Sequence, residues 1–203
     1  MLTIWGRLNS HNVKKVAWFA EELGLPYVRH DVGMQFGMSD AYLAKNPNAL
    51  IPTIEDGGFA LWESNAIVRY LASSYGGERF WPADPAKRAI SDRWMDWQMS
   101  YAVAQNGAFK NLVRVATENR DMAAVAQSAD ASAKMMQVLE RYLGETPWLS
   151  GTEFGIGDIP MGVYAHTFFT LDIGRPELPN VSDWYRRLRD RDGYANQVMI
   201  PLR

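Results

Sequence analysis

Two short segments of this chain combine residue types that suit the binding of a small acid. In the first, Pro52 interrupts an apolar run, and a proline at the start of a strand leaves backbone groups of its neighbour unpaired. In the second, the pair Glu63-Ser64 stands directly before an amphipathic helical pattern. A serine at a helix start offers a hydroxyl and free N–H groups, both of which hold carboxylates. Together the two segments predict a site for a small, peptide-like acid.

A third candidate is the connection between the first predicted strand and the first predicted helix. Ser10 and Asn12 stand there, where a hydroxyl or an amide hydrogen-bonds an anion with help from the helix dipole. Serine and asparagine are also the commonest helix caps. Taken alone, Ser10 is therefore better explained as a cap, and Glu63-Ser64 as an ordinary helix start.

The elements that must position these residues alternate between strand and helix. Strands are expected at 2–5 and 26–30, and as a hairpin around Gly57-Gly58. Apolar residues at helical spacing predict helices over 13–23, over 39–45 and from Ala66 onward; their positions include Val13, Val16, Ala17 and Ala20. This order predicts a small sheet with helices packed on it.

Beyond the glycines and prolines of residues 76–85, strand signals nearly vanish. Long helices are expected over 89–116 and 122–143, and two shorter ones over 158–171 and 181–191. The predicted fold class is therefore α/β plus all-α.

The expected division has three parts. Residues 1–78 form the mixed domain, residues 79–86 the linker and residues 87–203 the all-helical domain.

Composition excludes several classes of function. The 21 basic and 23 acidic residues form no basic stripe, so we expect no nucleic-acid partner. No apolar run approaches the roughly 18 residues of a membrane span. The count of zero cysteines excludes disulfides and a cysteine nucleophile, and it fits a cytoplasmic protein. His11, His30 and His166 are scattered, so we expect no metal site.

Four segments in combination resemble the glutathione S-transferases, over essentially the whole chain. They are residues 10–13, 46–53, 62–71 and 155–159. The resemblance implies a thioredoxin-like N-terminal domain, a helical C-terminal domain and a homodimer. It also implies a cis peptide bond before Pro52.

The same resemblance implies how glutathione is held. The backbone of Ile51, beside Pro52, pairs with the cysteinyl unit as an added strand does. Glu63 accepts a hydrogen bond from the γ-glutamyl ammonium. Ser64 and the free N–H groups at the helix start receive the γ-glutamyl carboxylate. The residue that holds the glycyl carboxylate is not assigned.

Ser10 and Asn12 take the catalytic roles that the resemblance implies. Ser10 donates to the glutathione sulfur, and Asn12 is the second candidate donor. The thiolate is the nucleophile, yet a free thiol has a pKa of about 8.5. A hydrogen bond to a charged group is worth about 1.5–3 kcal/mol, and one pKa unit about 1.36 kcal/mol. One donor at a helix N-terminus therefore lowers the thiol pKa by about one or two units.

The expected function is a detoxifying transferase that joins glutathione, its co-substrate, to a small and largely apolar electrophile. A glutathione-dependent disulfide-bond reductase and a non-catalytic binding protein of the same fold are the alternatives.

One departure from the family pattern concerns Gly155, where many relatives carry a Ser or Thr that caps a late helix in a box with Asp158. Glycine supplies no side-chain oxygen. A modest local effect on folding is expected there.

Overall fold

The computed structural model describes residues 1–203, which divide into two compact units: residues 1–83 with 192–200, and residues 84–191 with 201–203. The sequence pattern instead places every residue after 86 in the helical domain. The difference arises because the last helix, α9 (Asp192–Gln197), packs on the first unit. There Tyr194 meets Trp18 edge-on, with ring centroids 4.8 Å apart.

A four-stranded mixed sheet forms the centre of the first unit. Its strands are β1 (Leu2–Trp5), β2 (Tyr27–His30), β3 (Thr53–Asp56) and β4 (Phe59–Trp62), in the order β2-β1-β3-β4. β1 runs parallel to β2 and antiparallel to β3, and β3 and β4 form the predicted hairpin. The expected thioredoxin-like N-terminal domain is confirmed.

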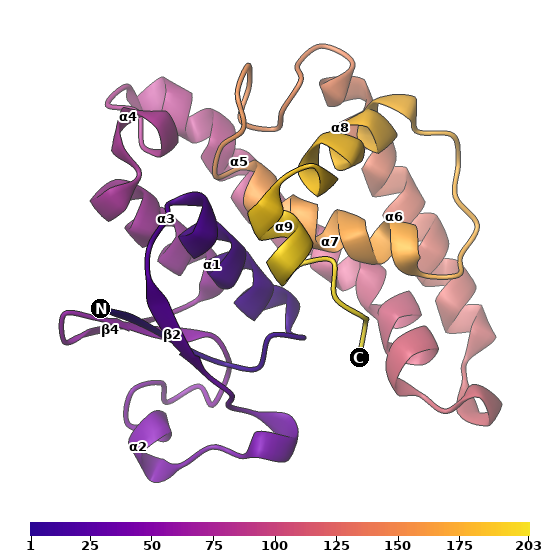
Figure 1. The fold of residues 1–203 in the computed structure, drawn as a ribbon. Coiled ribbons are helices and arrows are strands. Elements are labelled where there is room, and N and C mark those ends of the chain that lie inside the picture. The colour runs from indigo at the N-terminus through magenta and orange to yellow at the C-terminus, as the bar shows by residue number, and fades with distance from the viewer. The chain divides into compact units, whose positions relative to one another are not determined.

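Helices cover both faces of this sheet. Figure 1 shows α1 (His11–Glu22) and α3 (Ser64–Tyr75) on one side of the strands and α2 (Asp40–Leu43) on the other. The short helix α4 (Gly77–Phe80) follows α3 and was not expected from the sequence.

The inner face of α1 consists of the residues whose spacing predicted this helix. Val13, Val16, Ala17 and Ala20 are completely buried, as an apolar stripe at positions i, i+3, i+4 and i+7 requires. Burial of this stripe sets the position of the residues at the N-terminus of α1.

The second unit contains the four helices α5 (Pro85–Phe109), α6 (Met122–Leu143), α7 (Asp158–Thr170) and α8 (Pro179–Arg189). The all-helical prediction is confirmed. α5 begins four residues earlier than expected, because the side chain of Asp84 caps the helix and Pro85 suits its first turn. It ends earlier too, in a π-helical turn over Lys110–Arg114.

The turn before α7 is organised by the carboxylate of Asp158, which is completely buried. Its Oδ1 accepts hydrogen bonds from the backbone of Leu149 (2.8 Å) and the indole of Trp184 (2.9 Å), and its Oδ2 from the backbone of Gly155 (3.1 Å). Burial raises the pKa of Asp158, whereas these hydrogen bonds act in the opposite direction.

The oxygen missing at Gly155 comes from Ser150. Its Oγ accepts a hydrogen bond from the backbone N–H of Gly157, the N-cap of α7, at 3.0 Å. A Cβ at position 155 would lie 2.8 Å from the same Oγ. Ser150 and a serine at position 155 would therefore occupy the same space, so Gly155 accompanies Ser150.

None of the helices is both long and apolar enough to cross a membrane.

Candidate functional site

The peptide bond between Ile51 and Pro52 is cis, as the resemblance implied. Pro52 is buried and Ile51 half-buried at the start of β3. Ile51 takes part in no backbone hydrogen bond outside the regular elements. An extended peptide beside Ile51 would therefore find both a free donor and a free acceptor.

Buried polar side chains from α2 and the turn after it hold this segment. The amide of Asn46 donates to the carbonyl of Leu50 (2.9 Å) and to Oγ1 of Thr53 (3.1 Å). The hydroxyl of Tyr42 contacts the same two oxygens. Asn46, Tyr42 and Thr53 are at most 2% exposed, so buried side chains hold the carbonyl of Leu50 and the side chain of Thr53, on either side of Ile51-Pro52.

Glu63 stands at the junction of β4 and α3 in a backbone conformation that is unusual for a side chain. Its φ is +73°, and its exposed carboxylate forms no capping hydrogen bond. Such a conformation costs on the order of 1–3 kcal/mol and persists only where its surroundings impose it. Glu63 therefore places a carboxylate without a capping hydrogen bond beside the N-terminus of α3, next to the buried Ser64.

Ser10 is the N-cap residue of α1 by its backbone, since its carbonyl accepts from the N–H of Lys14 at 2.9 Å. Its half-buried side chain, however, makes no capping hydrogen bond. The hydroxyl is therefore left at the positive end of the α1 dipole. Asn12, in the first turn of α1, is exposed.

Two contacts bring these segments to one place. A Cβ on Gly6, in the loop after β1, would lie 3.1 Å from the Cβ of Ile51, so this loop lies against the Ile51 segment. Five residues into α1, the ammonium of Lys15 donates to Oγ of Ser64 at 3.3 Å. The loop before α1 therefore lies against the cis peptide, and the side chain of Lys15 on α1 reaches the start of α3.

Lys15 is the functional candidate that the sequence reasoning missed. It is completely buried, and its burial lowers the pKa of the ammonium to about 7, although Glu63 acts to raise it. No sequence signal pointed to it, because Lys14 and Lys15 lie outside the apolar stripe of this helix, on sides where lysines are ordinarily exposed. Buried lysines with displaced pKa values cluster at functional sites.

No group of three metal-binding side chains comes together within residues 1–203.

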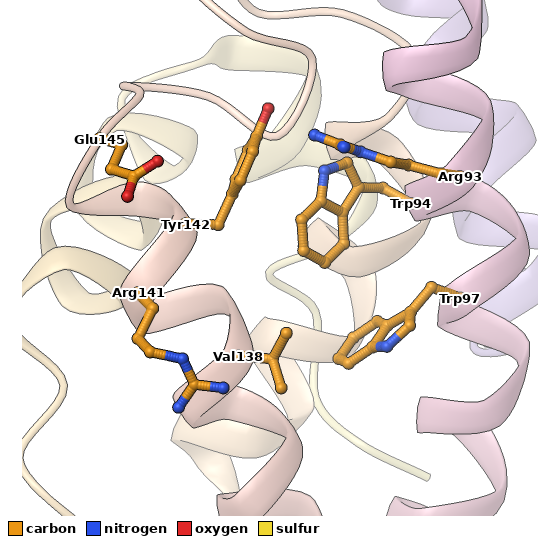
Figure 2. A pocket seen from close by; sticks show the side chains of 7 residues that line it. All are labelled: Arg93, Trp94, Trp97, Val138, Arg141, Tyr142 and Glu145. Carbon is orange, nitrogen blue, oxygen red and sulfur yellow. The ribbon is translucent and has the colours of Figure 1, made fainter.

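The second unit contains a separate pocket of about 480 Å³ between α5 and α6. Figure 2 shows its aromatic wall, formed by Trp94 and Trp97 from α5 and Tyr142 from α6. The ring centroid of Trp94 lies 5.5 Å from that of Trp97 and 4.9 Å from that of Tyr142. The guanidinium of Arg93 covers the face of Tyr142 at 5.0 Å.

Comparison with known proteins gives three findings. Residues 6–79 match the family model described as "Glutathione S-transferase, N-terminal domain". The chain is 42% identical to the glutathione S-transferase GstB of Escherichia coli over the full length of both. It is 29% identical to the disulfide-bond oxidoreductase YfcG of Escherichia coli, over 93% of this chain and 90% of that protein.

A solved structure extends the similarity to three dimensions. The theta class glutathione S-transferase from Xanthomonas axonopodis pv. citri, with glutathione bound, matches with a TM-score of 0.96. The two are 45% identical, and the match covers 100% of this chain and 99% of that one. The full-length identity to GstB and this fold agree with the resemblance found in the sequence, and the chain belongs to the glutathione S-transferase family.

Proposed function

We propose that the first unit binds glutathione and activates its thiol as a thiolate, which attacks a small and largely apolar electrophile. One observation carries this proposal: Ser10 has the backbone of a helix cap but a hydroxyl that caps nothing. The bound glutathione in the similar Xanthomonas enzyme supports the choice of ligand.

The proposed binding of glutathione, a tripeptide, uses its γ-glutamyl end and its central cysteinyl unit. The free backbone groups of Ile51, beside cis-Pro52, pair with the cysteinyl unit. The exposed carboxylate of Glu63 accepts from the γ-glutamyl ammonium, while Ser64 and the N–H groups of α3 receive the γ-glutamyl carboxylate. The charged ammonium and carboxylate of the γ-glutamyl unit are thereby bound at one end, and the backbone of the cysteinyl unit is bound as a strand in the middle.

The proposed activation needs a donor and no base. Ser10 donates to the sulfur at the positive end of α1, and both effects stabilise the anion. A hydrogen bond to a charged group is worth about 1.5–3 kcal/mol, which corresponds to about one or two units of thiol pKa. Asn12 is the second candidate donor, although its side chain is exposed.

Steady-state turnover of a chlorinated nitroaromatic compound with glutathione tests the transferase activity. We expect turnover above the buffer rate in wild type and a large loss in Ser10→Ala. If neither this compound nor any other electrophile is turned over while glutathione still binds, the chain is a binding protein and the proposal is wrong.

A glutathione-dependent disulfide reductase is the second candidate, and it is favoured by the similarity to YfcG and by the Ser10-x-Asn12 pattern. The activated thiolate would attack a disulfide, releasing one thiolate and forming a mixed disulfide. A second glutathione would then release the other thiol and form oxidised glutathione. Turnover of hydroxyethyl disulfide, compared with that of the nitroaromatic compound, ranks the two activities.

We further infer a homodimer. Large apolar side chains are exposed on both units, with Phe59 and Trp62 on β4 and Met99 and Val103 on α5. Exposed apolar patches mark interaction surfaces. Light scattering coupled to size exclusion tests this inference: we expect twice the 23.0 kDa chain mass, and a monomer contradicts it.

A further inference from the structure

The pocket in the second unit exists because the facing side chains of α5 and α6 change in size along the two helices. At one end the contact is close: Oγ of Ser128 donates to the carbonyl of Ala104 at 2.6 Å, and a Cβ on Gly107 would lie 3.0 Å from the Cβ of Ser128. Nearer the start of α5 and the end of α6, the bulky rings of Trp94 and Tyr142 face each other instead. The distance between packed helices follows the size of the side chains between them, and a space of about 480 Å³ remains beside these rings.

This pocket has the size and the lining of a small-molecule site. Ligand pockets typically measure about 300–1,000 Å³ and combine a mainly apolar, aromatic wall with a few polar groups. The wall here consists of Trp94, Trp97, Val138 and Tyr142. The last three are only half-buried, so part of their apolar surface stays open to a ligand. A flat aromatic ring suits such a wall, because aromatic rings stack on one another in offset or edge-to-face arrangements.

The rim of the pocket carries more positive than negative charge. Figure 2 shows Arg93 from α5 and Arg141 from α6 on opposite sides of the pocket; both are exposed, and Glu145 is the one carboxylate of the lining. Neither guanidinium forms an ion pair, and that of Arg93 instead lies over the rings of Trp94 (5.6 Å) and Tyr142 (5.0 Å). Guanidinium groups match carboxylates, to which they donate two parallel hydrogen bonds.

A buried donor beside Arg93 lacks an acceptor. Trp94 is 6% exposed, and its indole Nε1 makes no hydrogen bond. In Figure 2 this nitrogen lies on the edge of the ring nearest to Arg93. A buried indole N–H ordinarily finds a partner. An acceptor that draws the guanidinium of Arg93 off the two rings would therefore meet two donors, one charged and one neutral.

We propose that this pocket binds a planar aromatic carboxylate. The ring of the ligand lies against Trp94 and Trp97, and its carboxylate accepts from Arg93 and from Nε1 of Trp94. Arg141, on the opposite side, adds a second positive charge that attracts the anion. The inference does not depend on the proposed function, because every residue that it uses belongs to the second unit.

Calorimetry with 2-naphthoate tests the proposal, with the uncharged 2-naphthamide as the matched ligand. Wild type should bind 2-naphthoate about tenfold more tightly than 2-naphthamide, because only the carboxylate pairs with guanidinium groups. Saturating S-hexylglutathione, which competes for the proposed glutathione site, should leave the affinity for 2-naphthoate unchanged. Absence of 2-naphthoate binding, equal affinity for the two ligands, or displacement by S-hexylglutathione overturns the proposal.

Substitutions of charged residues locate the carboxylate. Arg93→Gln should weaken 2-naphthoate binding about tenfold and Arg141→Gln about threefold, and neither should change 2-naphthamide binding. Glu145→Gln should have the opposite sign and strengthen 2-naphthoate binding. Lys110→Gln removes a positive charge from an exposed position at the far end of α5 and should affect neither ligand. An equal loss in Arg93→Gln and Lys110→Gln would indicate general electrostatic attraction and overturn the proposal.

Trp97→Leu locates the aromatic ring. This variant should weaken 2-naphthoate and 2-naphthamide by the same factor, about tenfold, because both ligands carry the same ring. Wild-type affinity for both ligands in a folded Trp97→Leu protein contradicts the proposed position of the ring. If Trp97→Leu does not fold, the variants at Arg93, Arg141 and Lys110 still decide, because these three side chains are exposed.

Discussion

Each unit contains a completely buried ionisable side chain, and the two differ in charge and in their hydrogen-bond partners. Asp158 in the second unit accepts hydrogen bonds from Leu149, Gly155 and Trp184. Lys15 in the first unit donates to the neutral oxygens of Ser64 and Asn65, and its pKa falls to about 7. The difference teaches that the buried carboxylate of Asp158 organises the turn before α7, whereas the buried ammonium of Lys15 lies against the start of α3.

The largest expected effect is loss of stability on changing Asp158→Ala. The substitution leaves the donors of Leu149, Gly155 and Trp184 unsatisfied, so the free energy of unfolding should fall by about 3–5 kcal/mol. Urea denaturation measures it, with the exposed Asp172→Ala as the matched control. Loss of turnover per folded molecule, without loss of stability, would contradict the structural role of Asp158.

The next effect concerns glutathione binding and the exposed carboxylate of Glu63. Glu63→Ala removes the acceptor for the γ-glutamyl ammonium, and a charged hydrogen bond of this kind corresponds to roughly a 10- to 100-fold change in affinity. Calorimetry with glutathione checks this, with Glu153→Ala as an exposed control in the second unit. Unchanged affinity in Glu63→Ala would remove Glu63 from the proposed site.

A smaller effect is expected at the turn before α7, where a side chain at position 155 would collide with Ser150. Gly155→Ser places a Cβ 2.8 Å from Oγ of Ser150 and should lower the free energy of unfolding by about 1–3 kcal/mol. The double variant with Ser150→Gly relieves the clash and should recover part of this loss. If the two changes simply add in urea denaturation, the two sites are independent.

The smallest effect is the pH dependence that Lys15 gives to stability without ligand. Between its folded pKa of about 7 and the ordinary lysine pKa of 10.5, the unfolded chain binds more protons at this residue than the folded one. The contribution of Lys15 to the free energy of unfolding therefore rises with pH over this range. The difference in unfolding free energy between wild type and Lys15→Met should grow between about pH 7 and 9, by at most about 1.4 kcal/mol per unit. A constant difference would contradict the lowered pKa.

Local patterns predicted the regular elements well, because those elements bury periodic apolar faces. The stripe through Val13, Val16, Ala17 and Ala20 located α1, and the glycine pair located the β3–β4 hairpin. α9 was missed because its six residues are held by contacts with α1, a helix that lies far away in the sequence.

Non-local partners also explain what was missed at the site. The cis peptide bond before Pro52 and the start of α3 at Ser64 agree with the sequence prediction. A cap and a free hydroxyl at Ser10, however, are indistinguishable in one dimension. Lys15 was missed because its neighbour Ser64 lies 49 residues away.

The central claim is that Ser10 stabilises a thiolate on bound glutathione. The most direct measurement is a pH titration of the ultraviolet absorbance of the thiolate in complexes of glutathione with wild type and Ser10→Ala. The bound thiol should titrate below the free value of about 8.5 in wild type, and about one or two pH units higher in Ser10→Ala, with binding retained. The same thiol pKa in both complexes would contradict the claim.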